Sequence, residues 1–585
     1  MHSPSFARRC NPRGGVRGQR PQAASLILVA LAATLAACLA SSARAAAPAR
    51  PPNVLLIVTD DQGYGDLGCH GNRVLRTPHL DRLYAQSIRL TNFHVDPTCS
   101  PTRAALLTGR YSARTGVWHT IMGRSLLRRD EVTMADLFAV AGYRTGIFGK
   151  WHLGDNYPYR PQDRGFQETL IHGGGAIGNT PDYWGNTYLS PTLCHNGRWE
   201  KQSGYCTDVF FAAAMRFIAA RRSEPFFVYL PTNVPHAPLQ VPDKYSQPYL
   251  KDGLQRQLAL FYGMIGNFDE NLGRLLAQLD ELRLSENTIV IFMSDNGSAG
   301  GGYNVQMRGA KGSAYDGGHR VPCFIRWPAR LKGGFDVPQI TAHVDLLPTL
   351  LELCAIRPPR NVLFDGRGLT PLLVKVEDWA PRTLFVQSQR IETPQPWTNS
   401  AVMTDRFRLV DGRELFEMQS DPGQRVNVAG AQRATVDKLR FAYEEWYKDV
   451  SKRFGEYCPI GVGSPKEDPT QLTAHDWHGP NPPWDQTMVA ARVQANGFWA
   501  IEVERAGRYR VTLRERPAAA GFALPAGTAR LKIGDKVETQ PIAAGATAVA
   551  FEVELRPGAT QLQTWLNEAS GATRGAYYVE VRRLE

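Results

Sequence analysis

The chain has 585 residues, of which 43% are hydrophobic and 21% charged, a composition typical of a folded protein with roughly two to four domains. Its formal net charge is +12, and removal of residues 1–45, which hold six arginines and no acid, would lower it to +6. Because this mild excess comes without a run of lysine and arginine suited to a nucleic-acid groove, the composition argues against a nucleic-acid partner.

The first 45 residues predict an export signal. Five arginines come first, and the apolar run that follows, Ser25 to Ala37, is too short to span a membrane comfortably. Small residues and an Ala-Arg-Ala sequence at 43–45 then provide a cleavage pattern. We therefore expect a periplasmic or extracellular protein. The alternative is a lipoprotein signal, Leu-Ala-Ala-Cys, which would end before Cys38 and leave a lipid anchor on Cys38.

Four apolar runs without polar alternation predict strands that are buried on both faces, as in a parallel sheet. They are Val54–Thr59, Thr145–Phe148, Phe226–Leu230 and Thr288–Ser294. Helical patterns such as Met134–Ala141 and Leu258–Leu282 separate them. The predicted fold class is α/β, with a mixed, mainly parallel sheet flanked by helices. Such sheets bind ligands at the carboxyl ends of their strands.

Acidic residues follow the first and the last of these runs. Asp60 and Asp61 come directly after one, and Asp295 and Asn296 after the other. At a strand end the chain can turn and aim neighbouring side chains inward, where the carboxylates would repel one another without a cation. All-oxygen ligation favours Ca²⁺ over Zn²⁺. An Asx turn or helix cap explains either pair alone, whereas two pairs at matching strand ends favour a metal site.

The segment Cys99-Ser100-Pro101-Thr102-Arg103 predicts a helix that starts near Cys99, because Pro101 suits a first turn and Gly109 a helix end. A helix N-terminus offers free N–H groups to an anion. One turn further on, Arg103 could clamp a tetrahedral oxyanion with two hydrogen bonds. The alternative is a structural cysteine beside a surface arginine.

Four more residues could move protons or stabilise charge. Lys150 and His152 follow the second apolar run, His236 follows the third, and Lys311 precedes a tight loop at Gly317-Gly318. Each is a weak signal by itself.

The remaining chain predicts a hairpin and two further folded units. Cys194 and Cys206 flank Asn196-Gly197, which indicates a hairpin and suggests a local disulfide. Runs at 407–410 and 414–417 predict a second hairpin, followed by a helix over 433–447. Residues 458–485, rich in proline and glycine, predict a linker. Six short, alternating runs then predict a β-sandwich over 486–585, which we expect to contribute no catalytic group and to serve as a structural cap or a glycan-binding module.

Six motifs in this order resemble those of the type I sulfatases, of the alkaline-phosphatase-like superfamily, over about residues 50–450. They are Asp60-Asp61-Gln62-Gly63, Cys99-Ser100-Pro101-Thr102-Arg103 with Leu107-Thr108-Gly109-Arg110, Gly149-Lys150-Trp151-His152-Leu153-Gly154, Pro235-His236-Ala237-Pro238, Ser294-Asp295-Asn296-Gly297, and Lys311 with Gly317-Gly318-His319-Arg320-Val321-Pro322. Asp316 stands where the family often has Glu. The resemblance implies a catalytic domain over 50–380 and a C-terminal subdomain over 381–457.

The resemblance also implies the chemistry. In this family a formylglycine-generating enzyme oxidises the motif cysteine, here Cys99, to formylglycine (3-oxoalanine). Its hydrate carries two hydroxyls, one to attack sulfur and one to expel sulfate afterwards. By the same resemblance, Asp60, Asp61, Asp295, Asn296 and modified Cys99 hold Ca²⁺. Arg103 and Lys150 stabilise the hydrate, His152 acts as the base, and His236 and Lys311 bind sulfate.

We therefore expect a sulfuric ester hydrolase of the arylsulfatase type, whose natural substrate is a sulfated polysaccharide or a small aryl sulfate. One alternative is a phosphonate or phosphate ester hydrolase of the same superfamily, although no additional ligand set for a second metal is evident. The other alternative is a non-catalytic carbohydrate-binding protein, against which the complete set of site residues argues.

Overall fold

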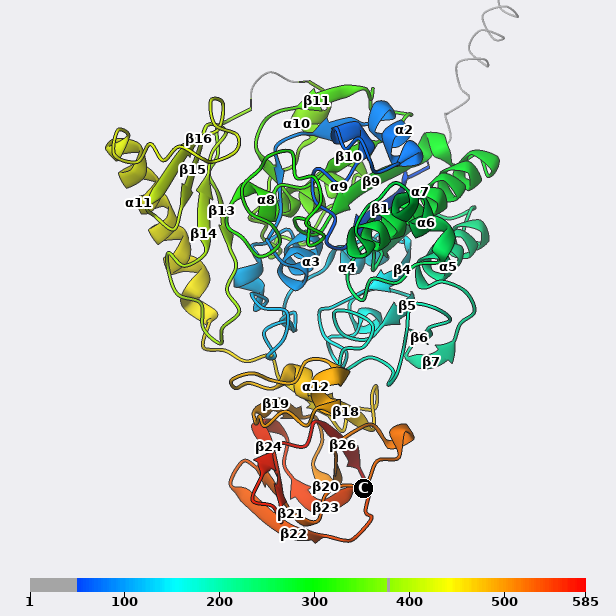
Figure 1. The fold of residues 1–585 in the computed structure, drawn as a ribbon, viewed down its shortest axis with the longest axis vertical. Coiled ribbons are helices and arrows are strands. Elements are labelled where there is room, and N and C mark those ends of the chain that lie inside the picture. Colours follow the sequence, from blue (N-terminus) through cyan, green and yellow to red (C-terminus); the bar gives the residue numbers. More distant parts are fainter. Residues whose placement is uncertain (1–49, 376–378, 585) are drawn as a thin grey trace, which may run out of the picture. The chain divides into compact units, whose positions relative to one another are not determined.

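The computed structural model describes residues 50–375 and 379–584, so the predicted signal segment and Cys38 lie outside the described residues. Within the described ranges, no helix is both long enough and apolar enough to cross a membrane. A ten-stranded sheet with the order β11-β2-β10-β9-β1-β8-β4-β5-β6-β7 forms the centre of the large α/β part (Figure 1). Its strands are β1 (Asn53–Thr59), β2 (Ile88–Leu90), β4 (Arg144–Lys150), β5 (Glu168–His172), β6 (Thr192–His195), β7 (Arg198–Lys201), β8 (Phe226–Pro231), β9 (Thr288–Ser294), β10 (Cys323–Arg326) and β11 (Phe335–Val337).

The middle of this sheet is parallel, and the four predicted strands are confirmed as β1, β4, β8 and β9. Strand β1 pairs in parallel with β8 on one side and β9 on the other, so that Leu56 lies opposite Tyr229 and Ile291. Strand β4 continues the parallel order between β8 and β5, whereas β10 joins β9 antiparallel. The carboxyl ends of β1, β4, β8 and β9 therefore meet at one edge. A separate parallel pair is formed by β3 (Phe93–His94) and β12 (Thr341–Ala342).

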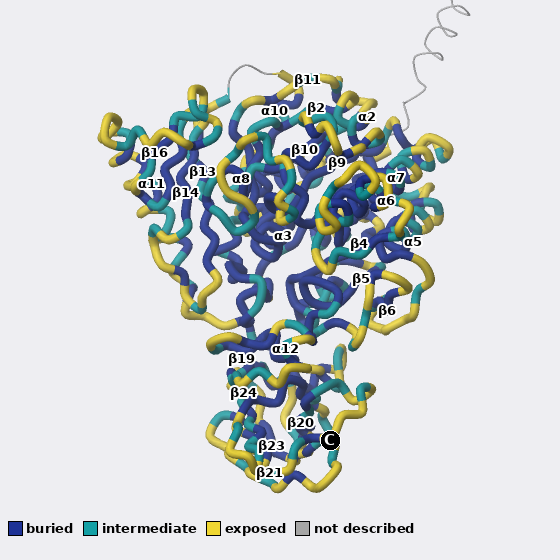
Figure 2. Tube along the Cα trace, in the orientation of Figure 1, coloured by how far each residue is buried: buried dark blue, intermediate teal, exposed yellow. Residues whose placement is uncertain are grey.

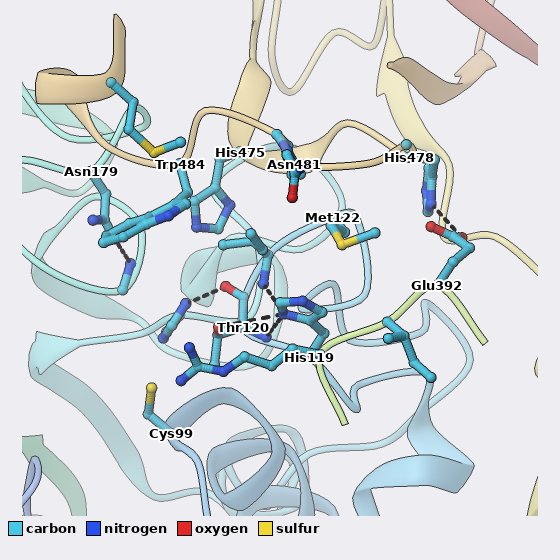
Figure 3. Close-up of a pocket in the computed structure, with 18 of the residues that line it drawn as sticks. Cys99, His119, Thr120, Met122, Asn179, Glu392, His475, His478, Asn481 and Trp484 are labelled. Atoms are coloured by element: carbon cyan, nitrogen blue, oxygen red, sulfur yellow. Dashed lines mark hydrogen bonds and ion pairs between the residues drawn. The ribbon is translucent and has the colours of Figure 1, made fainter. Parts of the chain in front are cut away.

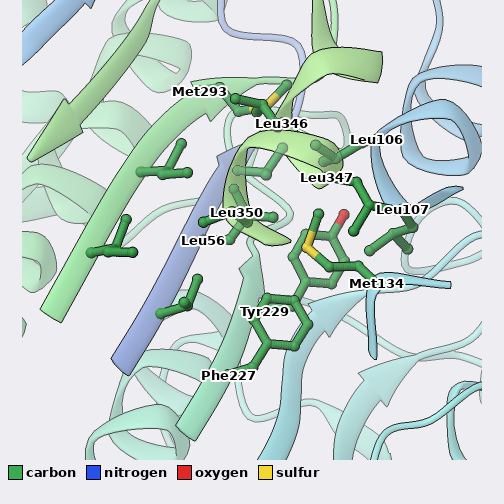
Figure 4. Packing of buried hydrophobic residues seen from close by; sticks show 14 of the residues in the cluster. Leu56, Leu106, Leu107, Met134, Phe227, Tyr229, Met293, Leu346, Leu347 and Leu350 are labelled. Atoms are coloured by element: carbon green, nitrogen blue, oxygen red, sulfur yellow. The ribbon is translucent and has the colours of Figure 1, made fainter. Parts of the chain in front are cut away.

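Successive residues of β1 face two different hydrophobic cores, because strand side chains alternate between the faces of a sheet. Val54, Leu56 and Val58 belong to one core, and Leu55 and Ile57 to the other. Figure 4 shows Leu56 among its neighbours in the first core, and the strands in the middle of the sheet are buried (Figure 2). Helices α3 (Cys99–Thr108), α4 (Met134–Val140), α9 (Leu346–Leu353) and α10 (Thr370–Leu373) pack in the first core. Helices α2 (Pro78–Gln86), α5 (Cys206–Ala220) and α7 (Arg256–Glu281) pack in the second, and α6 (Asp243–Lys251) lies against α7. The fold is thus a mixed, mainly parallel sheet between two helical layers.

A smaller antiparallel sheet follows. It consists of β13 (Leu384–Gln387), β14 (Ser400–Met403), β15 (Phe407–Val410) and β16 (Glu414–Glu417), in that order. The second predicted hairpin is confirmed as β15–β16, with Val410 opposite Glu414. The predicted helix is confirmed as α11 (Arg433–Val450), which buries Leu439 and Tyr443 against Val402 of the sheet.

Two further sheets share one hydrophobic core and form the predicted β-sandwich. One holds β17 (Ile460–Val462), β19 (Phe498–Val503), β24 (Gly558–Glu568), β21 (Gly527–Ile533) and β22 (Lys536–Ile542), with β25 (Thr573–Arg574) paired to β24. The other holds β18 (Thr470–Thr473), β26 (Tyr578–Arg583), β20 (Gly507–Arg514) and β23 (Val549–Leu555). The six predicted runs correspond to β19, β20, β21, β23, β24 and β26, the last of which begins one residue later than predicted, at Tyr578. Strand β22 was not among the predicted runs, because its polar sequence buries little besides Ile542.

The prediction of a linker over 458–485 is wrong, because most of this segment is part of the sandwich. Strand β17 pairs with β19, and β18 pairs with β26. Ile460, Val462 and Leu472 are buried in the sandwich core, which is why these short stretches are strands despite the surrounding prolines and glycines. The remaining helix here is α12 (Gln486–Ala490).

The hairpin predicted at Asn196-Gly197 is confirmed, but the disulfide beside it is wrong. Both turn residues have positive φ, as a two-residue turn between β6 and β7 requires. The partner of Cys194 across the hairpin is Trp199, whereas Cys206 begins helix α5. All seven cysteines in the described part of the chain are free thiols.

Candidate active site

The acidic residues after β1 and β9 turn toward each other, as predicted. Asp61 has a φ of 71°, which turns the chain sharply at the end of β1. Its backbone N–H donates to Asp295 Oδ1 at 3.2 Å, and Asn296 Nδ2 donates to Asp61 Oδ1 at 2.8 Å. The two strand ends therefore form one buried polar cluster.

Helix α3 delivers Cys99 to the same place. The helix begins at Cys99, and it ends at Gly109, which adopts the left-handed conformation that terminates helices. Every residue of the helix is buried, and Cys99 itself is only 3% exposed. The predicted helix is thus confirmed, with its N-terminus directed at the cluster.

The guanidinium of Arg103 binds Asp295 and the backbone at Lys150. Its Nη2 and Nε donate to Asp295 Oδ2 at 2.6 and 3.2 Å, and Nη1 donates to the Lys150 carbonyl at 2.9 Å. A fully buried guanidinium requires a carboxylate partner, and Asp295 takes that place. Arg103 thus holds Asp295 with two hydrogen bonds, and its contact with an oxyanion stays a prediction.

Each lysine of the site is paired with one carboxylate. Lys150 Nζ lies 2.8 Å from Asp60 Oδ2, with both side chains buried, and Lys311 Nζ lies 2.5 Å from Asp61 Oδ1. Burial by itself would raise the pKa of Asp61, but the Lys311 ammonium and the His236 ring hold it well below its ordinary value. Asp61 is therefore ionised at neutral pH.

The two histidines are held neutral, each with one ring nitrogen free. Burial, opposed in part by Asp61, lowers the pKa of His236 to about 3, and burial with the Lys150 charge lowers the pKa of His152 well below its ordinary value. His152 Nε2 donates to the Thr120 carbonyl at 2.9 Å, which leaves a buried, unpaired Nδ1 that can accept a proton. His236 Nδ1 donates to a carbonyl at 2.6 Å, and its Nε2 lies 3.8 Å from Asp61 Oδ2.

The cluster has the donor set of a hard cation site. Ligand atoms of Asp60, Cys99 and Asp295 lie within 4.8 Å of one another. Asp60 Oδ1 and Asn296 Oδ1 are buried without a hydrogen-bond partner, which is costly for oxygen atoms unless something else binds them. Burial, together with the neighbouring Asp60, raises the pKa of Asp295 to about 6 despite Arg103. These residues fit an oxygen-preferring divalent ion such as Ca²⁺.

A cavity of about 960 Å³ opens above this cluster (Figure 3). Five of the predicted site residues line it: Asp61, Cys99, His152, His236 and Lys311. The other five, Asp60, Arg103, Lys150, Asp295 and Asn296, are not part of its lining; Asp295 and Asn296 bond to Asp61, and Arg103 and Lys150 pair with Asp295 and Asp60. The structure thus brings together all ten predicted residues, whose individual roles stay predictions.

Sequence reasoning missed much of the cavity wall. Its lining includes His119, Thr120 and Met122 from the loop after α3, Arg390 and Glu392 from the loop after β13, and Tyr457, His475, His478, Asn481 and Trp484 from the C-terminal part. The exception is Trp484, whose place in a proline-rich segment could have indicated a ligand-binding residue. The C-terminal part supplies none of the ten predicted residues, but it is not separate from the active site.

Family models match two overlapping parts of the chain. The model described as Sulfatase matches residues 52–356, and the one described as N-sulphoglucosamine sulphohydrolase, C-terminal, matches residues 310–445. The first range holds all ten residues of the site. Both ranges end before the β-sandwich begins.

Sequence and structure comparisons with individual proteins also find sulfatases. The chain is 35% identical to arylsulfatase A of Homo sapiens, over 61% of this chain and 73% of that protein, and 34% identical to steryl-sulfatase of Mus musculus, over 60% and 70%. Among solved structures, Ps i-CgsB in complex with k-i-k-neocarrahexaose is similar, with a TM-score of 0.64 and 27% identity over 70% of this chain and 95% of that one.

Proposed function

This chain belongs to the sulfatase family and is a sulfuric ester hydrolase, and we propose that it cleaves sulfate monoesters with a formylglycine made from Cys99. The observation that carries the proposal is the meeting of Cys99 with Asp60 and Asp295 at the floor of the cavity. Ca²⁺, held by Asp60, Asp61, Asp295 and Asn296, would polarise the sulfate oxygens.

The residues around Cys99 have distinct tasks in this proposal. Formylglycine supplies, as its hydrate, the nucleophilic hydroxyl. His152 takes up a proton at Nδ1, which is free because Nε2 is held by Thr120. Lys311 keeps a positive charge at the sulfate end, since burial would lower its pKa but the Asp61 carboxylate raises it. Lys311 is therefore better suited than neutral His236 to donate a hydrogen bond to the leaving oxygen.

We further propose a sulfated sugar as the natural substrate. The similar structure of Ps i-CgsB holds an oligosaccharide, and a cavity of about 960 Å³ is at the upper end of the range for ligand pockets. The export signal predicted at residues 1–45 fits an enzyme that meets polysaccharides outside the cytoplasm. A formylglycine-generating enzyme would then act on the chain before the catalytic part folds over Cys99.

Formylglycine formation predicts a mass change at one residue. When the chain is co-expressed with a formylglycine-generating enzyme, we expect the tryptic peptide that contains Cys99 to be about 18 Da lighter than its thiol form, because an aldehyde replaces CH₂–SH. Peptides that contain Cys323 or Cys354 should keep their thiols. An active preparation whose Cys99 is entirely an unmodified thiol would contradict the mechanism.

A further inference from the structure

The segment His475–Met488, which we call the C-terminal wall, closes the cavity on the side opposite Cys99 (Figure 3). We infer that this wall is the subsite for the leaving group: Trp484 stacks on a sugar ring, and His475 accepts a hydrogen bond from one of its hydroxyls. The inference rests on the proposed function and adds to it a binding site in a part of the chain that neither family model matches.

The C-terminal wall is held in place by bonds to the catalytic domain. The backbone N–H of Met122 donates to the His475 carbonyl at 2.9 Å. The backbone N–H of Thr180 donates to the Trp484 carbonyl at 3.1 Å. Gln486 adds side-chain bonds to carbonyls of the same catalytic-domain loop. Since loops of the catalytic domain fix both ends of the wall, its side chains are positioned before substrate arrives.

His475 presents an unused acceptor to the cavity. Its Nδ1 lies 3.2 Å from Asp476 Oδ1, and a carboxylate accepts hydrogen bonds, so the ring proton is on Nδ1 and the lone pair on Nε2. The side chain is only 2% exposed, and Nε2 has no partner. Its ring lies 6.0 Å from that of His152, next to the reacting centre. A substrate hydroxyl would supply the missing hydrogen bond.

Glu392 presents a second unused acceptor. Its Oε1 receives bonds from Arg124 at 2.8 Å and from His478 at 2.9 Å, whereas Oε2 is buried without a partner. A free carboxylate oxygen and a free imidazole nitrogen are both groups that hydrogen-bond to hydroxyls. The cavity wall therefore suits a ligand that carries hydroxyls.

Trp484 provides the surface for that ring. It is 43% exposed although it lines the cavity, so one part of the indole is open to a ligand. Ligand pockets typically combine aromatic surface with a few placed polar groups, and the two free acceptors meet that description here. The C–H face of a pyranose would cover the indole while one of its hydroxyls reaches the neighbouring His475 (Figure 3).

The test compares two substrates in the full chain. We would measure kcat/KM for 4-nitrophenyl sulfate, whose leaving group has no further hydroxyl, and for the best substrate among galactose and N-acetylglucosamine monosulfates. His475→Ala and Trp484→Ala should each lower kcat/KM at least tenfold more for the sugar sulfate than for the aryl sulfate. His475→Gln, which keeps an acceptor, should recover part of the loss. Trp199→Ala is the matched control, because Trp199 is 41% exposed and outside the cavity.

If the substitutions lower kcat/KM equally for the two substrates, or leave the ratio of the two kcat/KM values unchanged, the subsite is wrong even though the sulfatase activity stands. Binding to Cys99→Ala protein, measured by calorimetry, separates the two proposals. Suppose that the wild-type protein hydrolyses neither ester, that the Cys99→Ala protein binds the sugar sulfate, and that the added substitution Trp484→Ala abolishes this binding. In that case the proposed function fails and the subsite holds. If the Cys99→Ala protein binds the sugar sulfate equally well with and without the substitutions Trp484→Ala and His475→Ala, the subsite is wrong.

Discussion

Replacement of Cys99 with alanine is expected to lower kcat/KM for 4-nitrophenyl sulfate by ~10⁴-fold or more, because the residue is the source of the proposed nucleophile and no neighbour can replace it. The side chain is buried at the start of α3 and makes no ion pair, so its removal should leave the fold intact. The measurement is steady-state kinetics on protein with a verified, unchanged melting temperature.

The matched control is Cys354→Ala, another buried cysteine, which packs in the hydrophobic core behind the sheet. It should lose some stability, as core truncations do, and keep its kcat. A Cys99→Ala protein that retains more than a few per cent of the wild-type rate would contradict a nucleophile at residue 99.

Replacement of Asp295 with asparagine is expected to lower kcat by about 10²- to 10³-fold, because it removes a carboxylate from the proposed Ca²⁺ site and from the Arg103 pair. It should also abolish the response to chelation. In the wild-type protein, removal of Ca²⁺ should lower the melting temperature, since an ion that binds only the folded state stabilises it. In Asp295→Asn the melting temperature should be the same with and without chelator.

Asp345→Asn is the control for the cost of breaking a buried ion pair. Asp345 is also fully buried and accepts from Arg382 at 2.8 Å, but it is not part of the cavity. It should lower stability and still show the wild-type response to chelation and nearly the wild-type kcat. If chelation changes neither the rate nor the melting temperature of the wild-type protein, the assignment of the metal site is wrong.

The floor of the site could be predicted because its signals are local. An unbroken apolar run predicts a buried parallel strand, and the residue after the run must lie at the carboxyl edge, so the sequence alone places Asp60 and Asp295 there. Pro101 and Gly109 likewise mark the two ends of α3, which brings Cys99 to that edge.

The interaction partners of side chains were less predictable from the sequence than the helix or strand in which each residue lies. Arg103 was correctly placed in α3, but its guanidinium binds Asp295 because a buried charge takes the nearest opposite charge, and nothing local to Arg103 identifies that carboxylate. The same limit explains Cys194 and Cys206, which are close in sequence and yet belong to a hairpin and a helix.

The sequence by itself therefore determined the α/β class, the ends of the strands and of helix α3, and the residues on the cavity floor, all of which depend on short-range periodicity and turn chemistry. Only the tertiary structure decided that His475 and Trp484 face Cys99 across the cavity. Their position depends on backbone hydrogen bonds between His475 and Met122 and between Trp484 and Thr180. The two residues of each pair are separated by more than half the length of the chain. Such docking leaves no periodic trace in either segment, because each is an irregular loop whose conformation is set by the other.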